Sequence, residues 1–211
     1  MNQILLGTTN PAKSKMLEAL LINLPVRVLK GHEQNIGPED EEQGTSHTAI
    51  AIRKALEWSK LFPMPVISSD GGIEIPSLNN QWSSILTKRQ TGNERTSDIA
   101  RAQNLLELLH GKEGEERSAL RTEAVAIASD GRLVATWQAS GLPCFIAYDA
   151  EFPVPENEGA WLESLLITPS GRRWWKMDSS DFENIREPWY QLREPVEKLL
   201  ADFMLKEGQH A

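Results

Sequence analysis

Short apolar runs alternate with helix-like spacings of apolar residues along the first half of the chain. Short, mainly apolar runs at 3–7 and 26–29 predict two strands. Between them, leucines three or four positions apart predict a helix whose N-terminus lies near Pro11. A strand, a polar loop and a helix in this order present free backbone N–H groups and the positive end of the helix dipole. The loop before Pro11 is therefore a predicted anion site, to which Lys13 adds a cation.

Two more helices are indicated by capping residues and apolar stripes. The first begins at a cap of Ser46 or Thr48 and runs to about residue 61. The second begins at Thr96 or Ser97 and runs through residue 109. The residues expected on the buried face are Ala49, Ile52 and Leu56 in the first of these helices, and Ala102, Leu105, Leu106 and Leu109 in the second.

The second half of the chain is mainly strand-like. Alternating runs at 120–128 and 133–139 flank Ser129-Asp130-Gly131, which predicts a hairpin. The other elements expected are strands at 145–152 and 162–168, a final helix beginning near Pro195, and loops at 78–96 and 112–117. Helices alternating with strands, followed by a mainly antiparallel part, indicate one mixed α/β domain over residues 1–211.

Residues 65–75 admit two interpretations. An apolar run stops at Asp70, which is followed by Gly71 and Gly72, and an alternating run then resumes. Asp-Gly between alternating hydrophobic residues is a strong signal for a β-hairpin, and these residues alone favour that interpretation. The alternative is a carboxylate at the end of a buried strand, beside glycines that let the phosphates of a ligand approach the backbone closely.

Composition narrows the class of protein. The chain has 211 residues, of which 40% are hydrophobic and 25% charged, as in an ordinary globular protein. Its apolar runs are too short to span a bilayer, and we expect no signal peptide, since a strand begins almost directly after Met1. The net charge of −8 argues against non-specific binding to nucleic acid or to an anionic membrane. Cys144 is the one cysteine, which excludes an internal disulfide and favours a reducing cytoplasm.

Three motifs in the first half of the chain fit the pattern of one known family. Residues 8–13 fit a T-x-N-x-x-K loop that grips phosphate. Glu42-Gln43-Gly44, with Lys54 twelve residues after the glutamate, fits an E-x-G segment followed by a helical lysine. Residues 69–73 fit a D-D-S-G-L motif in part. On these motifs the chain resembles the Ham1/inosine triphosphatase family of nucleoside triphosphate pyrophosphatases.

Further matches extend the resemblance over nearly the whole chain. Residues 87–92 look like the family's S-A-R-Y-x-G, which places Arg89 at its arginine. Residues 145–152 resemble G-F-G-Y-D-P-x-F through Tyr148 and Asp149, and the terminal S-H-R falls on residues 191–193, which end with Arg193. The motifs occur in the order of the family and at nearly its spacing.

The chain departs from the family's pattern at several positions. Ser69 replaces the first aspartate of the acidic pair, Gly71 the serine after it, Ile50 the asparagine before the helical lysine, Ile146 the base-stacking aromatic and Leu192 the histidine. The half of the site that would hold phosphate and metal is thus largely kept, and the half that would recognise the base is altered. Because losing a hydrogen-bonding side chain from a selective pocket changes discrimination by orders of magnitude, we expect an altered base specificity.

The resemblance implies a long twisted sheet flanked by helices, with two lobes and a cleft between them, in a homodimer. It implies a cytoplasmic, Mg²⁺-dependent hydrolase that converts non-canonical purine nucleoside triphosphates to monophosphates and pyrophosphate. In this interpretation Glu42 and Asp70 hold Mg²⁺, Asp70 activates water, and Lys13 and Lys54 hold the triphosphate. The other residues implied in substrate binding are Thr8, Asn10, Gly71, Gly72, Arg89, Tyr148, Asp149 and Arg193.

Two other functions remain open from the sequence. Ser69 and Ile50 are compatible with a relative that binds a nucleotide, or a partner protein, without hydrolysis. A phosphatase acting on another phosphorylated metabolite is the second alternative. The four histidines, His32, His47, His110 and His210, show no metal-ligand spacing and are expected to be structural or exposed.

Overall fold

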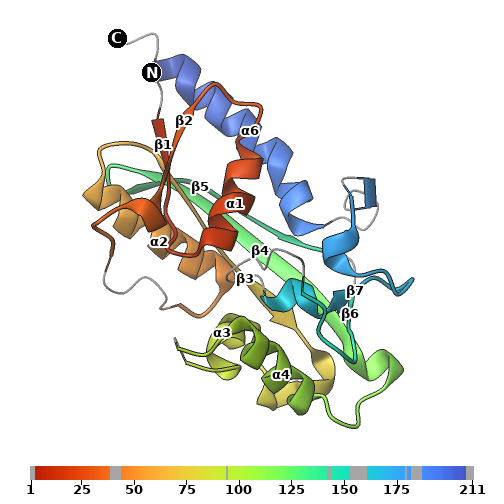
Figure 1. Ribbon diagram of the computed structural model, residues 1–211. Helices are drawn as coiled ribbons and strands as arrows, with labels where there is room; N and C mark the ends of the chain where they lie inside the picture. The colour runs from red at the N-terminus through yellow and green to blue at the C-terminus, as the bar shows by residue number, and fades with distance from the viewer. Residues whose placement is uncertain are drawn as a thin grey trace. The chain divides into compact units, whose positions relative to one another are not determined.

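Helices and strands alternate in the first half of the chain, and the second half is mainly strands and 3-10 helices up to a long final helix (Figure 1). The computed structural model describes residues 3–38, 44–93, 95–141, 144–152, 161–178, 180–181 and 187–207. The strands are β1 Gln3–Leu6, β2 Arg27–Lys30, β3 Val66–Glu74, β4 Ser118–Ser129, β5 Arg132–Ser140, β6 Cys144–Ile146 and β7 Leu166–Ile167. The α-helices are α1 Pro11–Leu20, α2 His47–Leu61, α3 Thr87–Gln90, α4 Asp98–Leu108 and α6 Pro188–Glu207. The 3-10 helices are η1 Gly31–Glu33, η2 Pro76–Gln81, η3 Ser84–Leu86, η4 Gly114–Arg117, η5 Trp161–Ser164 and η6 Trp174–Lys176.

The strands form a mixed sheet in the order β2-β1-β3-β4-β6-β7, with β5 paired to β4. β1 runs parallel to β2 and β3, whereas β6 is antiparallel to both β4 and β7. The mixed α/β fold class predicted from the sequence is therefore confirmed. Within the described part of the chain, no helix combines the length and apolar character that a bilayer crossing requires.

The chain divides into two compact units, each built from segments that are distant in sequence. Unit 1 comprises Met1–Asp70, Glu123–Ala139 and Pro188–Ala211, and unit 2 comprises Gly71–Thr122 and Ser140–Glu187. β3 passes from unit 1 to unit 2 after Asp70, and β4 passes from unit 2 to unit 1 after Thr122. A single two-lobed domain with a cleft stays a prediction.

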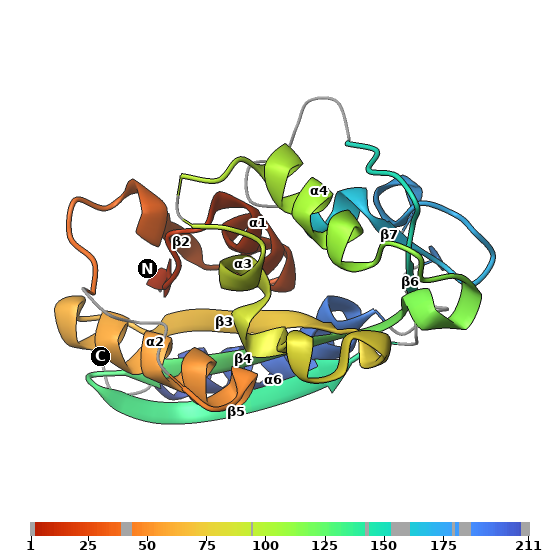
Figure 2. The same ribbon diagram turned by 90° about the horizontal axis from the view of Figure 1, so that it is seen from below.

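In unit 1, helices cover both faces of the strands because successive strand residues point to opposite sides. Val125 and Ile127 of β4 pack in one cluster with residues of α1 and α6. Ala124, Ala126 and Ala128, which alternate with them, pack in another cluster with alanines of α2. α2 accordingly lies alongside β4 (Figures 1 and 2). Alanine on both elements brings the helix close to the strand.

Unit 2 has its own core, which joins α4 to η2, β6, η5 and β7. A buried arginine, Arg117, stabilises this unit by hydrogen bonds to backbone carbonyl groups. Arg117, only 4% exposed, donates hydrogen bonds to the carbonyl oxygens of Leu109, Lys112, Ile146 and Ala147. The prediction of a solvated loop at 112–117 is therefore wrong at this residue, because the carbonyl groups left at the end of α4 and after β6 need donors.

Four other predictions of elements are corrected by the structure. Residues 78–96 contain most of η2 and the short helices η3 and α3 instead of a plain loop. The strand expected at 145–152 is limited to β6, and the one expected at 162–168 begins as η5 before β7. α6 begins at Pro188, with Pro195 in its interior, not at its start. Leu192 and Val196, which flank that proline, are buried in the core of unit 1, and this packing outweighs the hydrogen bond that the proline removes.

Candidate active site

Asp70 lies inside strand β3 and not in a turn. The strand runs unbroken from Val66 to Glu74 through Gly71 and Gly72, so the hairpin interpretation of residues 65–75 is wrong. The local signal is overridden because β1 and β4 lie on either side of β3 and hold it extended. The predicted hairpin at Ser129-Asp130-Gly131 is confirmed: Asp130 and Gly131 have positive φ angles of 51° and 70° between β4 and β5.

Alternation along β3 determines which side Asp70 faces. Val66 packs against Trp58 of α2, and the hydroxyl of Ser68 donates to the carbonyl oxygen of Gly7 at 2.8 Å. Asp70 follows on the same face as these two residues. Ser69 points to the opposite face, where its buried hydroxyl has no hydrogen-bond partner among the described residues.

Helix α2 brings two polar side chains onto the face that it turns to the strands. Its first turn is fixed by Ser46, whose Oγ accepts a hydrogen bond from the N–H of Ala49 at 3.1 Å, which confirms the predicted cap. The buried residues of the helix are His47, Ile50, Ala51, Lys54, Ala55, Trp58 and Ser59. The predicted buried face of Ala49, Ile52 and Leu56 is corrected: these residues are only half-buried, and Ile52 and Leu56 lie at the edge of the cluster that Ala51 and Ala55 form with the alanines of β4.

Three nitrogen atoms surround the carboxylate of Asp70. Nδ1 of His47 lies 2.7 Å from Oδ2, Nζ of Lys54 lies 3.2 Å from Oδ1, and Nζ of Lys13 lies 3.8 Å from Oδ1. Asp70, His47 and Lys54 are all buried, with 9%, 6% and 5% of their surface exposed. Lys13, Lys54 and Asp70 belong to three different motifs of the sequence, and the structure brings them to one place.

The charge around Asp70 changes its acidity. Burial alone would raise the pKa of the Asp70 carboxyl. The charge of Lys13, the hydrogen bond from His47 and the charge of Lys54 together outweigh burial and lower the pKa from 3.8 to about 2. The carboxylate is therefore ionised at neutral pH and accepts hydrogen bonds only.

The loop at 8–13 positions Lys13. Thr8 Oγ1 accepts a hydrogen bond from the N–H of Asn10 at 3.1 Å, and Asn10 Oδ1 accepts from the N–H groups of Ala12 at 2.8 Å and Lys13 at 3.4 Å. The N–H of Ser14 bonds to the carbonyl oxygen of Asn10, and the first helical residue is a proline without an N–H. The expectation of free N–H groups here is thus wrong, because Asn10 caps the helix itself. What this helix end offers an anion is its dipole and the amine of Lys13.

Two metal ligands, Glu42 and Asp70, are predicted from the sequence. Of these, the structure describes Asp70, and Glu42 lies outside the described residues. No group of three or more His, Cys, Asp or Glu residues suited to a metal ion occurs in the described part of the chain. Both oxygens of Asp70 are in contact with nitrogen donors. The described residues therefore do not by themselves form a magnesium site, which needs further oxygen ligands.

Two of the residues predicted to bind substrate, Tyr148 and Asp149, have partners within unit 2. The ring of Tyr148 lies 4.5 Å from Cζ of Arg117, and 66% of this tyrosine is exposed. Asp149 Oδ1 pairs with Nη2 of Arg173 at 2.7 Å. The two residues are held by neighbouring arginines on a surface that is open to solvent.

Two further residues predicted to bind substrate, Arg89 and Arg193, lie in different units. Arg89 is exposed on α3 in unit 2, and Arg193 belongs to α6 in unit 1, where its guanidinium lies 5.1 Å from the ring of Tyr190. Two of the five altered positions, those of the base-stacking aromatic and of the histidine, lie in hydrophobic cores: Ile146 is 1% exposed in unit 2, and Leu192 is 2% exposed in unit 1. Neither residue offers a surface aromatic ring or imidazole to a ligand.

His47 is the site residue that the sequence analysis misses. The lack of metal-ligand spacing predicts a structural or exposed residue, whereas the structure places its ring against Asp70. A signal for it is nevertheless present in the sequence. His47 and Lys54 are seven positions apart, which is two helical turns, so they share one face of α2.

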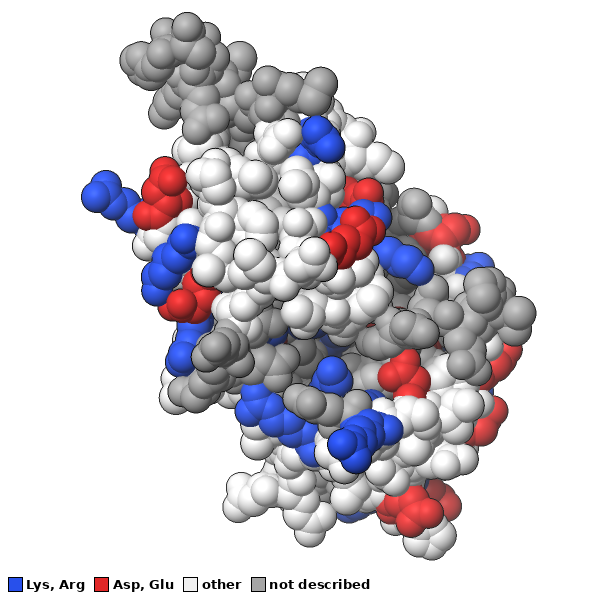
Figure 3. All heavy atoms as spheres, turned by 60° about the vertical axis from the view of Figure 1, so that its left-hand side comes forward, with Lys and Arg blue, Asp and Glu red and all other residues white. Residues whose placement is uncertain are grey.

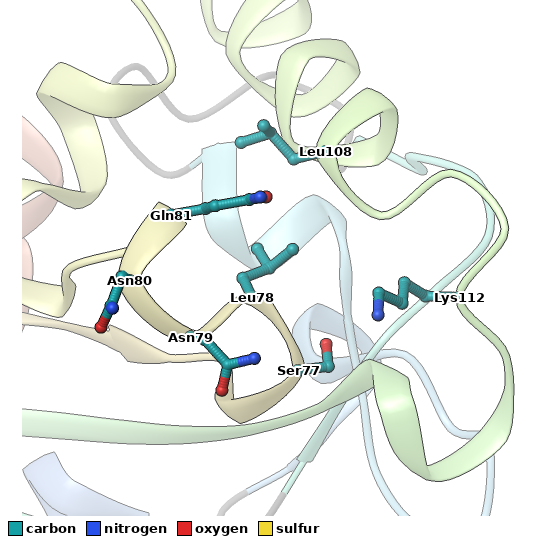
Figure 4. Close-up of a pocket in the computed structure, with 7 residues that line it drawn as sticks. All are labelled: Ser77, Leu78, Asn79, Asn80, Gln81, Leu108 and Lys112. Carbon is teal, nitrogen blue, oxygen red and sulfur yellow. The ribbon is translucent and has the colours of Figure 1, made fainter.

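A separate hollow of about 400 Å³ lies in unit 2 (Figure 4). Its lining residues are Ser77, Leu78, Asn79, Asn80, Gln81, Leu108 and Lys112. These residues do not include any predicted site residue. Lysines and arginines are interspersed with acidic residues on the face shown in Figure 3, and neither sign covers it.

A mixed sheet with helices on both faces, carrying a buried carboxylate flanked by two lysines, defines an α/β protein suited to binding an anion. Residues 4–141 match the model of the Ham1 family, and the chain belongs to this family. The resemblance predicted from the motifs is thereby confirmed.

Relatives with an assigned activity are similar over part of the chain. A dITP/XTP pyrophosphatase of Desulfotalea psychrophila is 32% identical over 135 residues, which cover 64% of this chain and 59% of that protein. A dITP/XTP pyrophosphatase of Legionella pneumophila is 34% identical over 128 residues, which cover 60% of this chain and 63% of that protein. The chain thus spans about three fifths of the length of these curated relatives.

Solved structures match over nearly the whole length. A HAM1 protein from Coxiella burnetii superposes with a TM-score of 0.72 at 24% identity, covering 96% of this chain and 100% of that one. The Ham1 protein of Staphylococcus aureus gives a TM-score of 0.69 at 20% identity, covering 93% and 99%. These proteins share the fold of this chain.

Proposed function

We propose that this protein hydrolyses nucleoside triphosphates to monophosphates and pyrophosphate, and so removes non-canonical purine nucleotides from the nucleotide pool. The observation that carries the proposal is the contact of Lys13 and Lys54 with the buried carboxylate of Asp70. Membership of the Ham1 family and the similarity to dITP/XTP pyrophosphatases support it.

Lys13 and Lys54 supply the positive charge that a bound triphosphate requires. Without substrate, both amines contact Asp70. A triphosphate carries more negative charge than one carboxylate, so it competes for the two lysines. Thr8 and Asn10 hold the loop that presents Lys13, and the dipole of α1 adds to the attraction.

Further phosphate contacts in this proposal come from the backbone of Gly71 and Gly72. Both glycines are extended residues of β3 that directly follow Asp70. The absence of a Cβ atom lets a ligand approach the backbone of such residues closely.

Asp70 is the proposed base for the attacking water. Once the lysines turn to the phosphates, the two charges that lower the pKa of Asp70 weaken, while burial, which raises it, remains. Apart from the effect of a metal ion on Asp70, loss of the two lysine contacts therefore increases the affinity of the carboxylate for a proton. A base of higher pKa takes a proton from water more readily.

Mg²⁺ belongs to the proposal as an ion that arrives with the triphosphate. Magnesium in phosphate sites is commonly bound by one or two carboxylates together with substrate oxygens and water. Asp70 and Glu42 are the candidate carboxylates. The ion would neutralise charge on the phosphate oxygens.

The base specificity is proposed to differ from that of the relatives. Ile146 and Leu192 lie in hydrophobic cores, so recognition of the base falls to other side chains. The candidates are Arg89, Tyr148, Asp149 and Arg193.

A coupled phosphate assay tests the proposal. The protein is incubated with Mg²⁺ and a panel of canonical and modified triphosphates, and phosphate is measured with malachite green, with and without added inorganic pyrophosphatase. We expect phosphate only when the coupling enzyme is present. The absence of turnover on every triphosphate by folded protein would overturn the proposal, and phosphate without the coupling enzyme would indicate a phosphatase.

The matched variants for this assay are Asp70→Asn and Asp130→Asn. Both make the same chemical change, but Asp130 lies in the β4–β5 turn with a positive φ angle that asparagine also tolerates. We expect Asp70→Asn to lose at least about a hundredfold in kcat, and Asp130→Asn to keep the wild-type rate. Equal rates for the two variants would remove Asp70 from the chemistry.

Calorimetry separates hydrolysis from binding without turnover. Ser69 in place of a carboxylate is the feature that favours a relative that binds only. If the wild type binds a triphosphate but releases no product over hours, the chain is a nucleotide-binding protein. If the wild type binds no triphosphate, neither hydrolysis nor nucleotide binding without hydrolysis is its function.

Two finer expectations also remain proposals. The homodimer rests on the family resemblance, and light scattering coupled to size-exclusion chromatography measures it. The cytoplasmic location is supported by the single cysteine among 211 residues.

A further inference from the structure

The contact between His47 and Asp70 extends the proposed function to a residue that no motif indicates. We propose that His47 is a positioning residue, which holds the Asp70 carboxylate in the orientation that it needs toward the water and phosphates of a bound triphosphate. This inference rests on the proposed function, and it gives the first residue of helix α2 a part in it.

The hydrogen bond in this pair has a defined direction. An ionised carboxylate can only accept, so Nδ1 of His47 carries the proton and donates to Oδ2 of Asp70. The separation of 2.7 Å lies in the short range typical of a charge-assisted bond. Only 7% of the His47 side chain and 13% of the Asp70 side chain are exposed, so bulk water competes little for this bond.

Two contacts from one helix fix the carboxylate. His47 occupies Oδ2, and Lys54, two turns further along α2, contacts Oδ1 at 3.2 Å. Each oxygen thus has its own partner, which determines the plane of the carboxylate as well as its position. The Ser46 cap fixes the first turn of α2, and with it the backbone from which His47 projects.

The two partners respond differently to a triphosphate. A lysine amine moves on four rotatable bonds and is drawn to phosphate, whereas an imidazole turns about only two. His47 is also 6% exposed, so its ring has little room to leave Asp70. When Lys54 and Lys13 turn to the phosphates, the bond from His47 remains to orient the carboxylate.

The neighbour of Asp70 in the chain cannot take this part. Ser69 follows the alternation of β3 and points to the opposite face. The orientation of Asp70 is therefore set from α2 and not from within the strand.

Two substitutions at His47 separate positioning from packing. His47→Phe keeps an aromatic ring but removes the donor, and His47→Asn places an amide nitrogen close to the position of Nδ1. The matched control is His110→Phe at an exposed position after α4. Each protein is first checked for folding by circular dichroism, and kcat and KM are then measured with the best triphosphate and Mg²⁺.

We expect His47→Phe to lose about tenfold to a hundredfold in kcat with little change in KM, as for a misplaced catalytic group. His47→Asn should regain a substantial part of kcat, and His110→Phe should match the wild type. An unchanged kcat in His47→Phe, or an equal loss in His47→Asn, would overturn the inference. If His47→Phe does not fold, the comparison of His47→Asn with wild type decides: a kcat within about tenfold of wild type supports positioning, and a larger loss contradicts it.

A spectroscopic measurement distinguishes failure of this inference from failure of the proposed function. In protein labelled with ¹⁵N-histidine, the Nδ1–H of His47 should give a proton resonance downfield of the amide region. The resonance should disappear in His47→Asn and shift in Asp70→Asn. Absence of this resonance in the wild type overturns the inference whatever the activity. A wild type without turnover overturns the proposed function, and the positioning role with it.

Discussion

The carboxylate of Asp70 receives its partners from two helices of unit 1, Lys13 from α1 and His47 and Lys54 from α2. A carboxylate in such surroundings stays charged although it is buried, because the nearby positive charge and the hydrogen bond outweigh desolvation. The same contacts hold the two lysine amines where an anion of higher charge, such as a triphosphate, can compete with Asp70 for them. A bound triphosphate would therefore change which anion the amines of Lys13 and Lys54 contact.

The acidity of Asp70 predicts how stability depends on pH. Its folded pKa of about 2 lies below the unfolded value of 3.8, so the stabilisation is complete above about pH 4 and is lost as the pH falls toward 2. The shift corresponds to about 2 kcal/mol. Urea unfolding at a series of pH values should therefore show a steeper acid loss for the wild type than for Asp70→Asn. If the free energy of unfolding fell with pH in parallel for the two proteins, the lowered pKa of Asp70 would be contradicted.

Cys144 predicts a second behaviour of a single residue. The thiol is fully buried, its Sγ donates to the carbonyl oxygen of Ala119 at 3.4 Å, and burial raises its pKa to about 12. A neutral, buried thiol is a poor nucleophile. We expect no reaction with a disulfide reagent in the folded protein near neutral pH, and one thiol per chain in denaturant. Rapid labelling of the native protein would show that the strand β6 opens.

At the scale of the element, helix α2 connects the core to the site. One face of the helix packs alanines against alanines of β4 and also carries His47 and Lys54 to Asp70. The limits of this helix and its cap were predictable from Ser46 and the apolar spacing. The buried face of the helix was not predictable. Large apolar residues such as Ile52 and Leu56 are expected to be buried first, whereas close packing of a helix against a strand favours small residues.

The alanine contact predicts a cost for overpacking. Ala55→Leu places extra volume between α2 and β4 and should lower the free energy of unfolding by about 1–3 kcal/mol. Leu56→Met, at the half-buried flank of the same helix, conserves volume and should cost clearly less. Chemical denaturation of both variants measures the difference. Equal stabilities would mean that the helix does not pack closely at position 55.

In the molecule as a whole, the sequence predicted the fold class and two of the three side chains that contact Asp70, those of Lys13 and Lys54, because these features depend on local patterns and on motif order. The course of β3 could not be predicted locally, since β1 and β4, which hold it extended, are distant in sequence. His47 also escaped prediction, because its role depends on how α2 packs against β3. The roles of Glu42 and of the other residues implied in substrate binding stay predictions.

In the proposed function, the chain cleaves a nucleoside triphosphate between its α and β phosphates through the group at Asp70. The most direct test is ³¹P NMR of the products formed from inosine triphosphate and Mg²⁺, and from the best substrate of the panel, by the wild type and by Asp70→Asn. We expect a nucleoside monophosphate and pyrophosphate in equal amounts from the wild type, and neither from Asp70→Asn at equal times. A nucleoside diphosphate with orthophosphate, or the same products at the same rate from both proteins, would contradict it.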